Sequence, residues 1–332
     1  MTTEQPGADP KEPTMTQPTP RETAHEITVR ATAERLYELI ADVGGWPSIF
    51  PPSVHADHLE RGDKEERIRL WATVDGQVKH WTSRRTLDRA GLRVDFRQEV
   101  PSPPMAAMGG AWIIEPTGPG ECRVRLLHDF RAVGDDPGTL DWIDRAVDAN
   151  SRSELAALKR HAERGADGPG EGDTFLTFED TVRLEGHVKD VYDFIDQAQH
   201  WADRLPHVTA VNLRDAGPGV QILAMDTLTK DGSPHTTESV RVCVPYERIV
   251  YKQTTLPPLM ALHTGEWSFA EDGAGATVVT SRHTAVVEPA AVTRVLGETA
   301  DLPAARRYLR EALGANSLAT LRHAGEYAAA RR

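Results

Sequence analysis

The chain has 332 residues, of which 39% are hydrophobic and 27% are charged, and its formal net charge is −12. Two cysteines in so long a chain exclude a disulfide framework, and no Cys-x-x-Cys pair indicates structural zinc. The acidic balance argues against nucleic-acid binding, no segment approaches the roughly 20 apolar residues of a transmembrane helix, and the N-terminus lacks a signal-peptide pattern. We therefore expect a soluble, cytoplasmic protein with no nucleic-acid or membrane partner.

Two segments of biased composition divide the chain. Residues 1–23 contain five prolines and no aromatic residue, so they bury too little apolar surface to offset ordering and are predicted to be a disordered tail. Residues 164–174 are rich in glycine and are predicted to be a flexible linker. Two folded domains are therefore expected, over residues 24–163 and 175–330.

The first domain begins with a strand and a helix. Ile27–Arg30 alternates like a strand, and Ala33–Ile40, which Thr32 can cap, has apolar residues at helical spacing. Gly44–Pro47 ends this helix, and a short helical turn through Phe50 is expected. Alternating strand-like runs and a long helical run follow: Ile68–Thr73, Val78–Leu87, Leu92–Glu99, Ala107–Ile114, Cys122–Ala132 and the helix Thr139–Glu163.

The two halves of the chain repeat one another. A shift of 155 positions aligns Tyr37 with Tyr192, Trp46 with Trp201, His80 with His235, Met105 with Met260, Trp112 with Trp267 and His128 with His283. Tryptophan makes up only 7 of the 332 residues, so two tryptophan matches at one offset favour duplication over coincidence. Because the period is too long for a solenoid unit, we interpret the chain as a tandem duplication of one domain.

Each half is predicted to contain one strand, two short helices, six strands and one long C-terminal helix. A strongly curved antiparallel sheet around the long helix satisfies this order and closes without filling its centre. We therefore predict an α+β protein of two tandem domains, each a curved seven-stranded antiparallel sheet around a long C-terminal helix with two short helices. Each domain is expected to enclose a cavity that can hold a small ligand.

Several motifs of the first half resemble a known family. Trp46-Pro47, Trp81–Arg85, Pro103–Met105 and Trp112 together resemble the aromatase/cyclases of bacterial type II polyketide synthases. These proteins belong to the helix-grip superfamily of START and Bet v 1-like domains. Two such domains in one chain are similar to the di-domain subclass, and the resemblance covers about residues 24–330.

The resemblance implies a function without a cofactor. Family members fold a poly-β-ketone carried on an acyl carrier protein, direct a regiospecific aldol closure and promote dehydration to an aromatic ring. Di-domain members act on chains already reduced by a ketoreductase and close the first ring between carbons 7 and 12. The implied partners are the acyl carrier protein, the ketosynthase and the ketoreductase, and the tandem pair is expected to act as a monomer with an internal pseudo-dimer. The alternatives are a non-catalytic carrier or sensor of hydrophobic ligands and an interaction scaffold.

An aldol closure needs a proton to leave carbon, a carbonyl oxygen to be stabilised and a hydroxyl to leave as water. Strand alternation places Trp81, Ser83 and Arg85 on one face of their run. A protonated arginine can polarise a ketone or enolate, and the resemblance matches Arg85 to the family's key pocket arginine, with Ser83 beside it. Arg97 matches another pocket arginine of the family. For both arginines the alternative is a solvated strand residue.

Further candidates for chemistry come from the histidines and from the second half. His128 and its repeat partner His283 are candidates for a general base or for orienting a water, with a structural histidine as the alternative. Arg241 and Ser239 take the places of the first half's arginine and serine after a one-residue shift. Thr237 stands where the first half has a tryptophan, which argues against equal activity of the two domains.

Large apolar side chains are expected to line the cavities, where aromatic walls suit a flat nascent ring, although an ordinary core is the alternative. The predicted lining residues are Trp46, Phe50, Trp81, Met105, Met108, Trp112 and Trp267. No metal site is expected, because no carboxylate or cysteine at ligand spacing accompanies the matched histidines His80 and His235.

Overall fold

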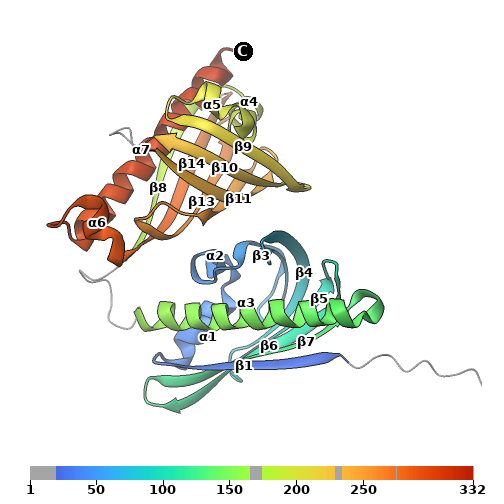
Figure 1. Cartoon of the computed structure of the whole chain (residues 1–332). Helices are drawn as coiled ribbons and strands as arrows, with labels where there is room; N and C mark the ends of the chain where they lie inside the picture. Colours follow the sequence, from blue (N-terminus) through green and yellow to red (C-terminus); the bar gives the residue numbers. More distant parts are fainter. Residues whose placement is uncertain (1–19, 165–173, 229–233, 274, 332) are drawn as a thin grey trace, which may run out of the picture.

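The computed structural model describes residues 20–164, 174–228, 234–273 and 275–331. Within these residues the chain forms two successive domains of the same architecture (Figure 1). Each domain has a seven-stranded antiparallel sheet in which the first strand pairs with the seventh and the other strands follow as a meander. In each domain the sheet curves around a long C-terminal helix. The predicted α+β fold of two tandem helix-grip domains is therefore confirmed.

The two domains contain the following elements. The first has β1 (Arg21–Val29), α1 (Ala33–Ala41), η1 (Val43–Gly45), α2 (Trp46–Ile49), β2 (Ser53–Arg61), β3 (Glu65–Val74), β4 (Gln77–Asp88), β5 (Arg93–Val100), β6 (Met105–Gly118), β7 (Glu121–Ala132), η2 (Val133–Asp135) and α3 (Pro137–Arg164). The second has β8 (Phe175–Glu185), α4 (Val188–Asp196), η4 (Ala198–His200), α5 (Trp201–Arg204), β9 (Val208–Gly217), β10 (Val220–Leu228), β11 (Pro234–Val244), β12 (Arg248–Thr255), β13 (Met260–Glu271), β14 (Ala276–Val287), η5 (Pro289–Ala291), α6 (Val292–Leu296) and α7 (Leu302–Ala329).

The first short helix forms for the reasons that its sequence indicates. The Thr32 side chain accepts a hydrogen bond from the backbone N–H of Arg35 and so caps α1. Leu36 and Ile40 lie on one face of α1 and are fully buried against the sheet. At the other end, the Asp42 side chain accepts a bond from the Gly44 N–H, which starts the short helical segment leading to α2.

The N-terminal boundary of the first domain differs from the prediction. β1 begins at Arg21, so residues 21–23, which were expected in the disordered tail, belong to the sheet. Their backbone pairs in continuous register with His128–Phe130 of β7, and this pairing satisfies backbone polar groups that their composition does not reveal. Residues 1–19 of the predicted tail and 165–173 of the predicted linker lie outside the described residues.

Two further elements lacked a clear signal in the sequence. β2 is buried at its start and exposed at its end, so its side chains do not alternate simply between core and solvent. In the second domain, η5 and α6 come between β14 and the long helix α7, which begins only at Leu302. The predicted order has the long helix directly after the last strand, and the inserted segment changes the offset between the repeats.

The core of each domain lies between the long helix and the concave face of the sheet. In the first domain Phe50, Trp112 and Leu126 pack with Leu155 and Leu158 of α3. Burying each such side chain contributes about 1.5–3 kcal/mol, so the helix is held to the sheet mainly by apolar contact. Among the residues that the structure describes, no helix combines the length and hydropathy needed to cross a membrane.

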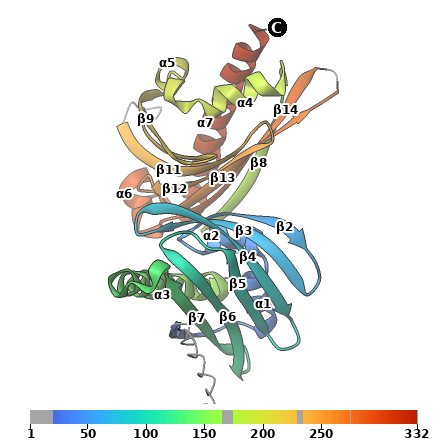
Figure 2. The ribbon, with the colours of Figure 1, turned by 90° about the vertical axis from the view of Figure 1, so that its right-hand side faces the viewer.

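The domains contact one another through the outer face of the second sheet. Val240 and Val242 of β11, together with Val220, pack against Val54 and Trp71 of the first domain. The neighbours of Val240 along β11 line the second domain's cavity, so strand alternation turns the valines outward. The two domains therefore share a small apolar interface, with α2 at the boundary between them (Figure 2).

A glycine that occurs at the same place in both domains, Gly110 in the first, lies at a closely packed point of the sheet. A Cβ at Gly110 would lie 1.9 Å from the Leu127 carbonyl oxygen, whereas a Cβ at Gly118 would meet nothing within 4 Å. We predict that Gly110→Ala lowers the free energy of unfolding by about 1–3 kcal/mol or more, because backbone must move to admit the methyl group. Gly118→Ala is the matched control and should change it by less than about 0.5 kcal/mol. Urea denaturation checks both; equal effects would contradict the packing.

Candidate active site

Two adjoining cavities lie between the sheet and α3 in the first domain. We call them the Arg85 cavity, of about 90 Å³, and the Met105 cavity, of about 130 Å³. The residues that line both are Trp81, Gln98, Met108, His128 and Glu154. The shared lining makes the two cavities parts of one pocket, which combines aromatic walls with a few polar groups.

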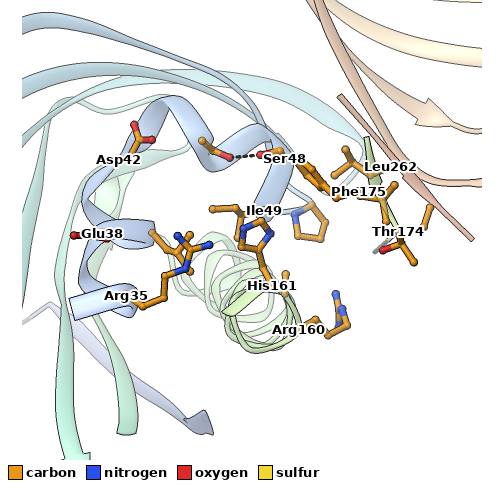
Figure 3. Close-up of a pocket in the computed structure, with 16 residues that line it drawn as sticks. Arg35, Glu38, Asp42, Ser48, Ile49, Arg160, His161, Thr174, Phe175 and Leu262 are labelled. Atoms are coloured by element: carbon orange, nitrogen blue, oxygen red, sulfur yellow. Dashed lines mark hydrogen bonds between the residues drawn. The ribbon is translucent and has the colours of Figure 1, made fainter. Parts of the chain in front are cut away.

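Most of the residues predicted for the first pocket do line it. The Arg85 cavity is bounded by Trp46, Phe50, Trp81, Ser83, Arg85, Met108, Trp112 and His128, and the Met105 cavity by Met105. The alternation of β4 works as expected, because Ser83 and Arg85 are buried while Arg84 between them is exposed. A larger cleft of about 650 Å³ lies between the domains, beside Arg160 and Leu262, and none of the predicted site residues lines it (Figure 3).

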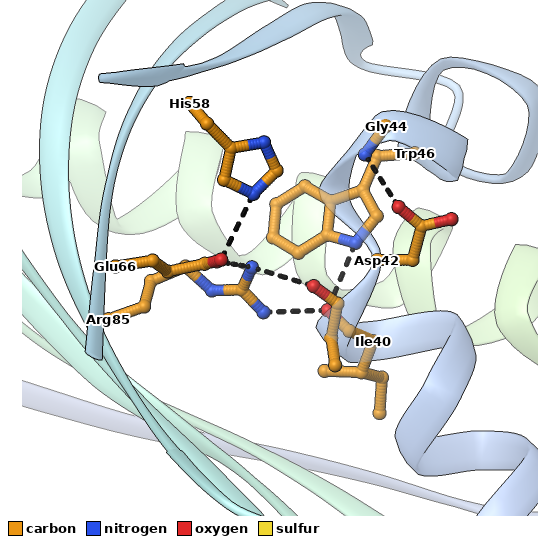
Figure 4. A network of polar contacts seen from close by, with 8 residues as sticks. Ile40, Asp42, Gly44, Trp46, His58, Glu66 and Arg85 are labelled. Atoms are coloured by element: carbon orange, nitrogen blue, oxygen red, sulfur yellow. Dashed lines mark hydrogen bonds and ion pairs between the residues drawn. The ribbon is translucent and has the colours of Figure 1, made fainter. Parts of the chain in front are cut away.

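Arg85 is the centre of a buried polar network (Figure 4). Its side chain is only 1% exposed, and its Nη1 lies 2.6 Å from Glu66 Oε1. The guanidinium also donates to two carbonyl oxygens at the end of α1, those of Ile40 at 2.7 Å and Ala41 at 3.1 Å. The Trp46 ring packs against the guanidinium, with 5.1 Å from Cζ to the ring centroid. A cation at the last carbonyls of a helix is favoured by the helix dipole.

This network changes what Arg85 can do. Burial lowers the pKa of Arg85 to about 10, against the opposing effect of Glu66, so the side chain stays charged at neutral pH. Its charge is already matched by a carboxylate and two carbonyls. Arg85 is predicted from its motif to polarise a substrate ketone, but its contacts instead join the end of α1 to β3 and β4, the strands that form the floor of the pocket.

The structure corrects the prediction for Arg97. Phe96 and Gln98 on either side of it line the pocket, so strand alternation turns Arg97 to the outer face of β5. There it is exposed and forms a two-point ion pair with Asp129 of β7, with 2.9 Å from Nη2 to Oδ1. Its side chain crosses over Gly109, where a Cβ would lie 2.2 Å from Arg97 Cζ. Arg97 is therefore a surface residue of the sheet and does not bind substrate in the pocket.

Three polar atoms around the first pocket are buried without a hydrogen-bond partner among the described residues. They are His128 Nδ1, Ser151 Oγ and Gln98 Oε1. Burial lowers the pKa of His128 to about 4, with His25 acting in the same direction, so its imidazole is neutral at pH 7. Unpaired buried polar atoms are costly, and at a pocket they indicate a place for a polar ligand.

Among the described residues, Glu154 is the one acidic residue that lines both parts of this pocket, and it is not among the predicted site residues. It lies on α3, one turn after Ser151, and faces the same cavity. Burial raises the pKa of Glu154 to about 7. A carboxyl with a pKa near neutrality can both take up and release a proton, which is the property expected of a general acid or base.

The second domain has a cavity of about 140 Å³ in the equivalent place. Arg241, Ser239, His283 and Trp267 line it, as predicted. The Arg241 guanidinium again donates to the last carbonyls of a short helix, those of Ile195 and Asp196 in α4. Gln221 of β10 pairs with Arg241 in the register where Glu66 pairs with the first domain's arginine, so the carboxylate partner is replaced by an amide.

In the second cavity, His283 forms hydrogen bonds with other protein side chains. His283 Nε2 lies 2.8 Å from Ser317 Oγ, and its Nδ1 lies 3.1 Å from both Tyr251 Oη and His263 Nε2. Burial lowers the pKa of His283 to about 4 and raises that of Tyr251 above its usual range, so both groups are neutral at pH 7. Tyr251 and His263 are not among the predicted site residues, and they stand where the first domain has phenylalanine and methionine.

A short motif on the two long helices was also missed. Asn150-Ser151 on α3 and Asn316-Ser317 on α7 each follow an alanine and each line the cavity of their own domain. They are 166 residues apart rather than 155, because η5 and α6 are inserted before α7. A search for the repeated Ala-Asn-Ser triplet, without a fixed offset, would have found them.

A separate change of offset, by one residue, explains a false match. His80 and His235 align at the constant shift, but His80 lies on the exposed face of β4, while His235 lines the second cavity and bonds to Thr227. The one-residue shift that aligns Arg241 with Arg85 places His235 opposite Lys79 instead. Within the described ranges, no cluster of three or more histidine, cysteine or acidic side chains could hold a metal ion.

Comparison with known proteins was consistent along the chain. The family model described as "Polyketide cyclase / dehydrase and lipid transport" matches residues 20–163 and again 176–326. The chain is 49% identical over 320 residues to the actinorhodin polyketide synthase bifunctional cyclase/dehydratase of Streptomyces coelicolor, covering 93% of this chain and 98% of that protein. It is 45% identical over 325 residues to the granaticin counterpart of Streptomyces violaceoruber, covering 98% of each.

Two solved structures match both domains together. The di-domain ARO/CYC BexL from the BE-7585A biosynthetic pathway is 57% identical, with a TM-score of 0.84 over 93% of this chain and 98% of that one. The di-domain ARO/CYC StfQ from the steffimycin biosynthetic pathway is 35% identical, with a TM-score of 0.82 over 93% of this chain and 99% of that one.

The Arg85 network predicts a large loss of stability when it is broken. Arg85→Met removes the cation held against Glu66 Oε1 and leaves this buried carboxylate, among the described residues, with His58 alone, 3.0 Å from its Oε2, so it should lower the free energy of unfolding by about 3 kcal/mol. The double change Arg85→Met and Glu66→Met should cost less than the single one, because no lone charge remains. Arg84→Met, on the exposed face of the same strand, is the control and should cost less than about 1 kcal/mol. Urea denaturation followed by circular dichroism measures all three; equal costs for the two arginines would refute the network's importance.

The pKa of Glu154 predicts a pH dependence of stability. Because its pKa is about 7 in the folded protein and near 4.5 when unfolded, the folded state binds more protons between these values. The free energy of unfolding therefore falls as pH rises through this window. Glu154→Gln removes the effect and should be more stable than wild type by about 1–3 kcal/mol at pH 8, with little difference at pH 4. Melting curves at both pH values test this, and a pH-independent difference would count against it.

Proposed function

The chain belongs to the polyketide cyclase/dehydrase and lipid transport family, and on that premise we propose that it is a bifunctional cyclase/dehydratase of a type II polyketide synthase. Its substrate is a ketoreduced poly-β-ketone on an acyl carrier protein. It closes the first ring between carbons 7 and 12 and removes water to give an aromatic ring. It works in the cytoplasm with the ketosynthase and the ketoreductase.

The observation that carries this proposal is the set of unpartnered polar atoms in the first pocket. His128, Ser151 and Gln98 present buried donors and acceptors to a cavity that aromatic side chains enclose. A folded poly-β-ketone carries oxygen atoms on alternate carbons, so a mostly apolar pocket with a few fixed polar groups can hold one folded conformation. A carrier of apolar ligands has no need of such groups, and their presence favours the enzyme over the carrier.

The chemistry is balanced within one substrate. A methylene carbon between two carbonyls loses a proton, and the resulting enol carbon bonds to a ketone carbon further along the chain. The ketone oxygen takes up a proton and becomes a hydroxyl. Loss of that hydroxyl with a neighbouring hydrogen forms a carbon–carbon double bond and releases water. No electron leaves or enters the system, so the protein has to supply only proton transfer, orientation and stabilisation of the oxygen.

Glu154 is the group best suited to move the protons. With a pKa near 7 it can accept the proton from carbon as the carboxylate and return it to the departing hydroxyl as the acid. His128, neutral in this pocket, is suited to hydrogen bonding with a carbonyl or with the leaving water. We assign Arg85 a positioning role, because its contacts hold the end of α1 and the Trp46 ring in place.

The first domain is the better candidate for the ring closure. In the second cavity the equivalent histidine and serine bond to each other, and a tyrosine and a second histidine complete the set. The second cavity also has buried polar atoms without a partner among the described residues, on His235, His263 and Gln253. What separates the two cavities is a carboxyl group, because Glu154 lines the first and no acidic residue of the described ranges lines the second. We therefore assign the first-ring closure to the first pocket and a supporting role to the second.

Product analysis in a reconstituted synthase tests the assignment. Glu154→Gln and His128→Phe, each added with a minimal synthase and ketoreductase, should lower the yield of first-ring product by about 10²-fold, the usual contribution of a general acid or base. Shunt polyketides should accumulate instead. Arg97→Gln, on the outer face of the sheet, is the control and should leave the yield unchanged. Wild-type yields from both pocket variants would remove these residues from the mechanism, and an inactive wild-type protein would sink the proposed function.

A further inference from the structure

One wall of the Arg85 cavity is built by α2 and the residue that follows it. Trp46 and Phe50 both line the cavity and pack edge to face, with ring centroids 5.3 Å apart. The Phe50 ring also stacks near Trp112 at 5.8 Å. This wall is a single helical turn, at whose end the Phe50 N–H donates to the Trp46 carbonyl, and so short a helix has little rigidity of its own.

The second domain holds this wall from outside. Lys252 lies on β12, where its neighbours Tyr251 and Gln253 line the second cavity, so its own side chain points outward to the first domain. Its ammonium group donates to the carbonyl oxygens of Phe50 and Ser53, both at 2.8 Å. The side chain is 6% exposed, so the contact is shielded from water.

We call the two hydrogen bonds from Lys252 to Phe50 and Ser53 the clamp, and its chemistry allows it to persist at different pH values. The Phe50 carbonyl lies at the end of α2, where a cation is favoured by the helix dipole. Burial lowers the pKa of Lys252 to about 7, yet the neutral amine still has two N–H groups, one for each carbonyl. The clamp therefore keeps both hydrogen bonds whether or not the lysine is protonated.

We propose that Lys252 is a positioning residue through which the second domain fixes the Phe50 wall of the first domain's cavity and so controls how the substrate folds there. The inference rests on the proposed cyclase function. It gives the second domain a role in the first ring closure that needs no chemistry in its own cavity, and it makes the two domains one catalytic unit.

A second contact across the interface provides a matched control. Arg248, also on β12, forms an ion pair with Asp57 of β2. It joins the same two domains at a similar place, but neither residue lines the Arg85 cavity or contacts α2 through a hydrogen bond that the structure shows. Removing it weakens the interface without releasing the wall.

The decisive experiment compares Lys252→Met with Arg248→Met in the full-length chain. Amide hydrogen exchange of residues 46–53 should become faster in Lys252→Met and stay unchanged in Arg248→Met, and this readout needs no enzymatic activity. In the reconstituted synthase, Lys252→Met should lower the ratio of first-ring product to shunt products by at least about fivefold, because small misplacements of a pocket wall reduce productive folding strongly. Arg248→Met should keep the wild-type ratio.

A double-mutant cycle tests whether the effect passes through Phe50. Phe50→Leu should alter the product ratio by itself, and adding Lys252→Met to it should cause little further change, whereas effects of unrelated residues would add. If Lys252→Met does not fold, Lys252→Gln, which is shorter but still polar, makes the same comparison. Unchanged exchange and an unchanged product ratio at Lys252, or equal effects at Arg248, would overturn the clamp. A wild-type protein that yields no first-ring product would instead overturn the function on which it rests.

Discussion

The buried guanidinium of Arg85 joins the end of α1 to the paired strands β3 and β4 of the first domain. Arg85 lies on β4, forms an ion pair with Glu66 of β3 and donates hydrogen bonds to two carbonyls at the end of α1. The Trp46 ring then packs against it. A charge this deeply buried is tolerated only where every partner is in place, so the network fixes one geometry for the floor and the adjoining wall of the pocket.

The duplication kept this scaffold and changed what lies inside it. Both domains place an arginine under a short helix and a histidine on the last strand of the sheet, facing a serine of the long helix. In the first pocket the histidine and serine atoms are unpartnered among the described residues, and a glutamate with a pKa near 7 lies nearby. In the second, His283 is bonded to Ser317, Tyr251 and His263. Other polar atoms at the second cavity, on His235 and Gln253, are also unpartnered among the described residues, but no acidic residue lines it, so the carboxyl group of the first pocket is what distinguishes the two.

The boundary between the domains connects these differences. The outer face of the second sheet contributes a polar contact as well as an apolar one. Lys252 extends from it and donates hydrogen bonds to the carbonyls of Phe50 and Ser53 in the first domain. That wall therefore has partners on both sides: the Arg85 network within the first domain and the lysine from the second. In the arrangement that we propose, the second domain holds the geometry of the first domain's pocket, which gives a physical reason for the two domains to remain in one chain.

The sequence by itself determined the duplication, the type of almost every element and the inward face of β4, because hydrophobic periodicity and strand alternation are local properties. Strand alternation placed Arg85 in the pocket correctly, but it could not show that the guanidinium is already bound to Glu66 and two backbone carbonyls. Arg97 was misplaced, and Glu154 was missed, because the inward face of β5 and of α3 depends on how the sheet packs against the helix. The contacts of Lys252 depend entirely on the tertiary structure, since its partners lie about 200 residues away in the other domain.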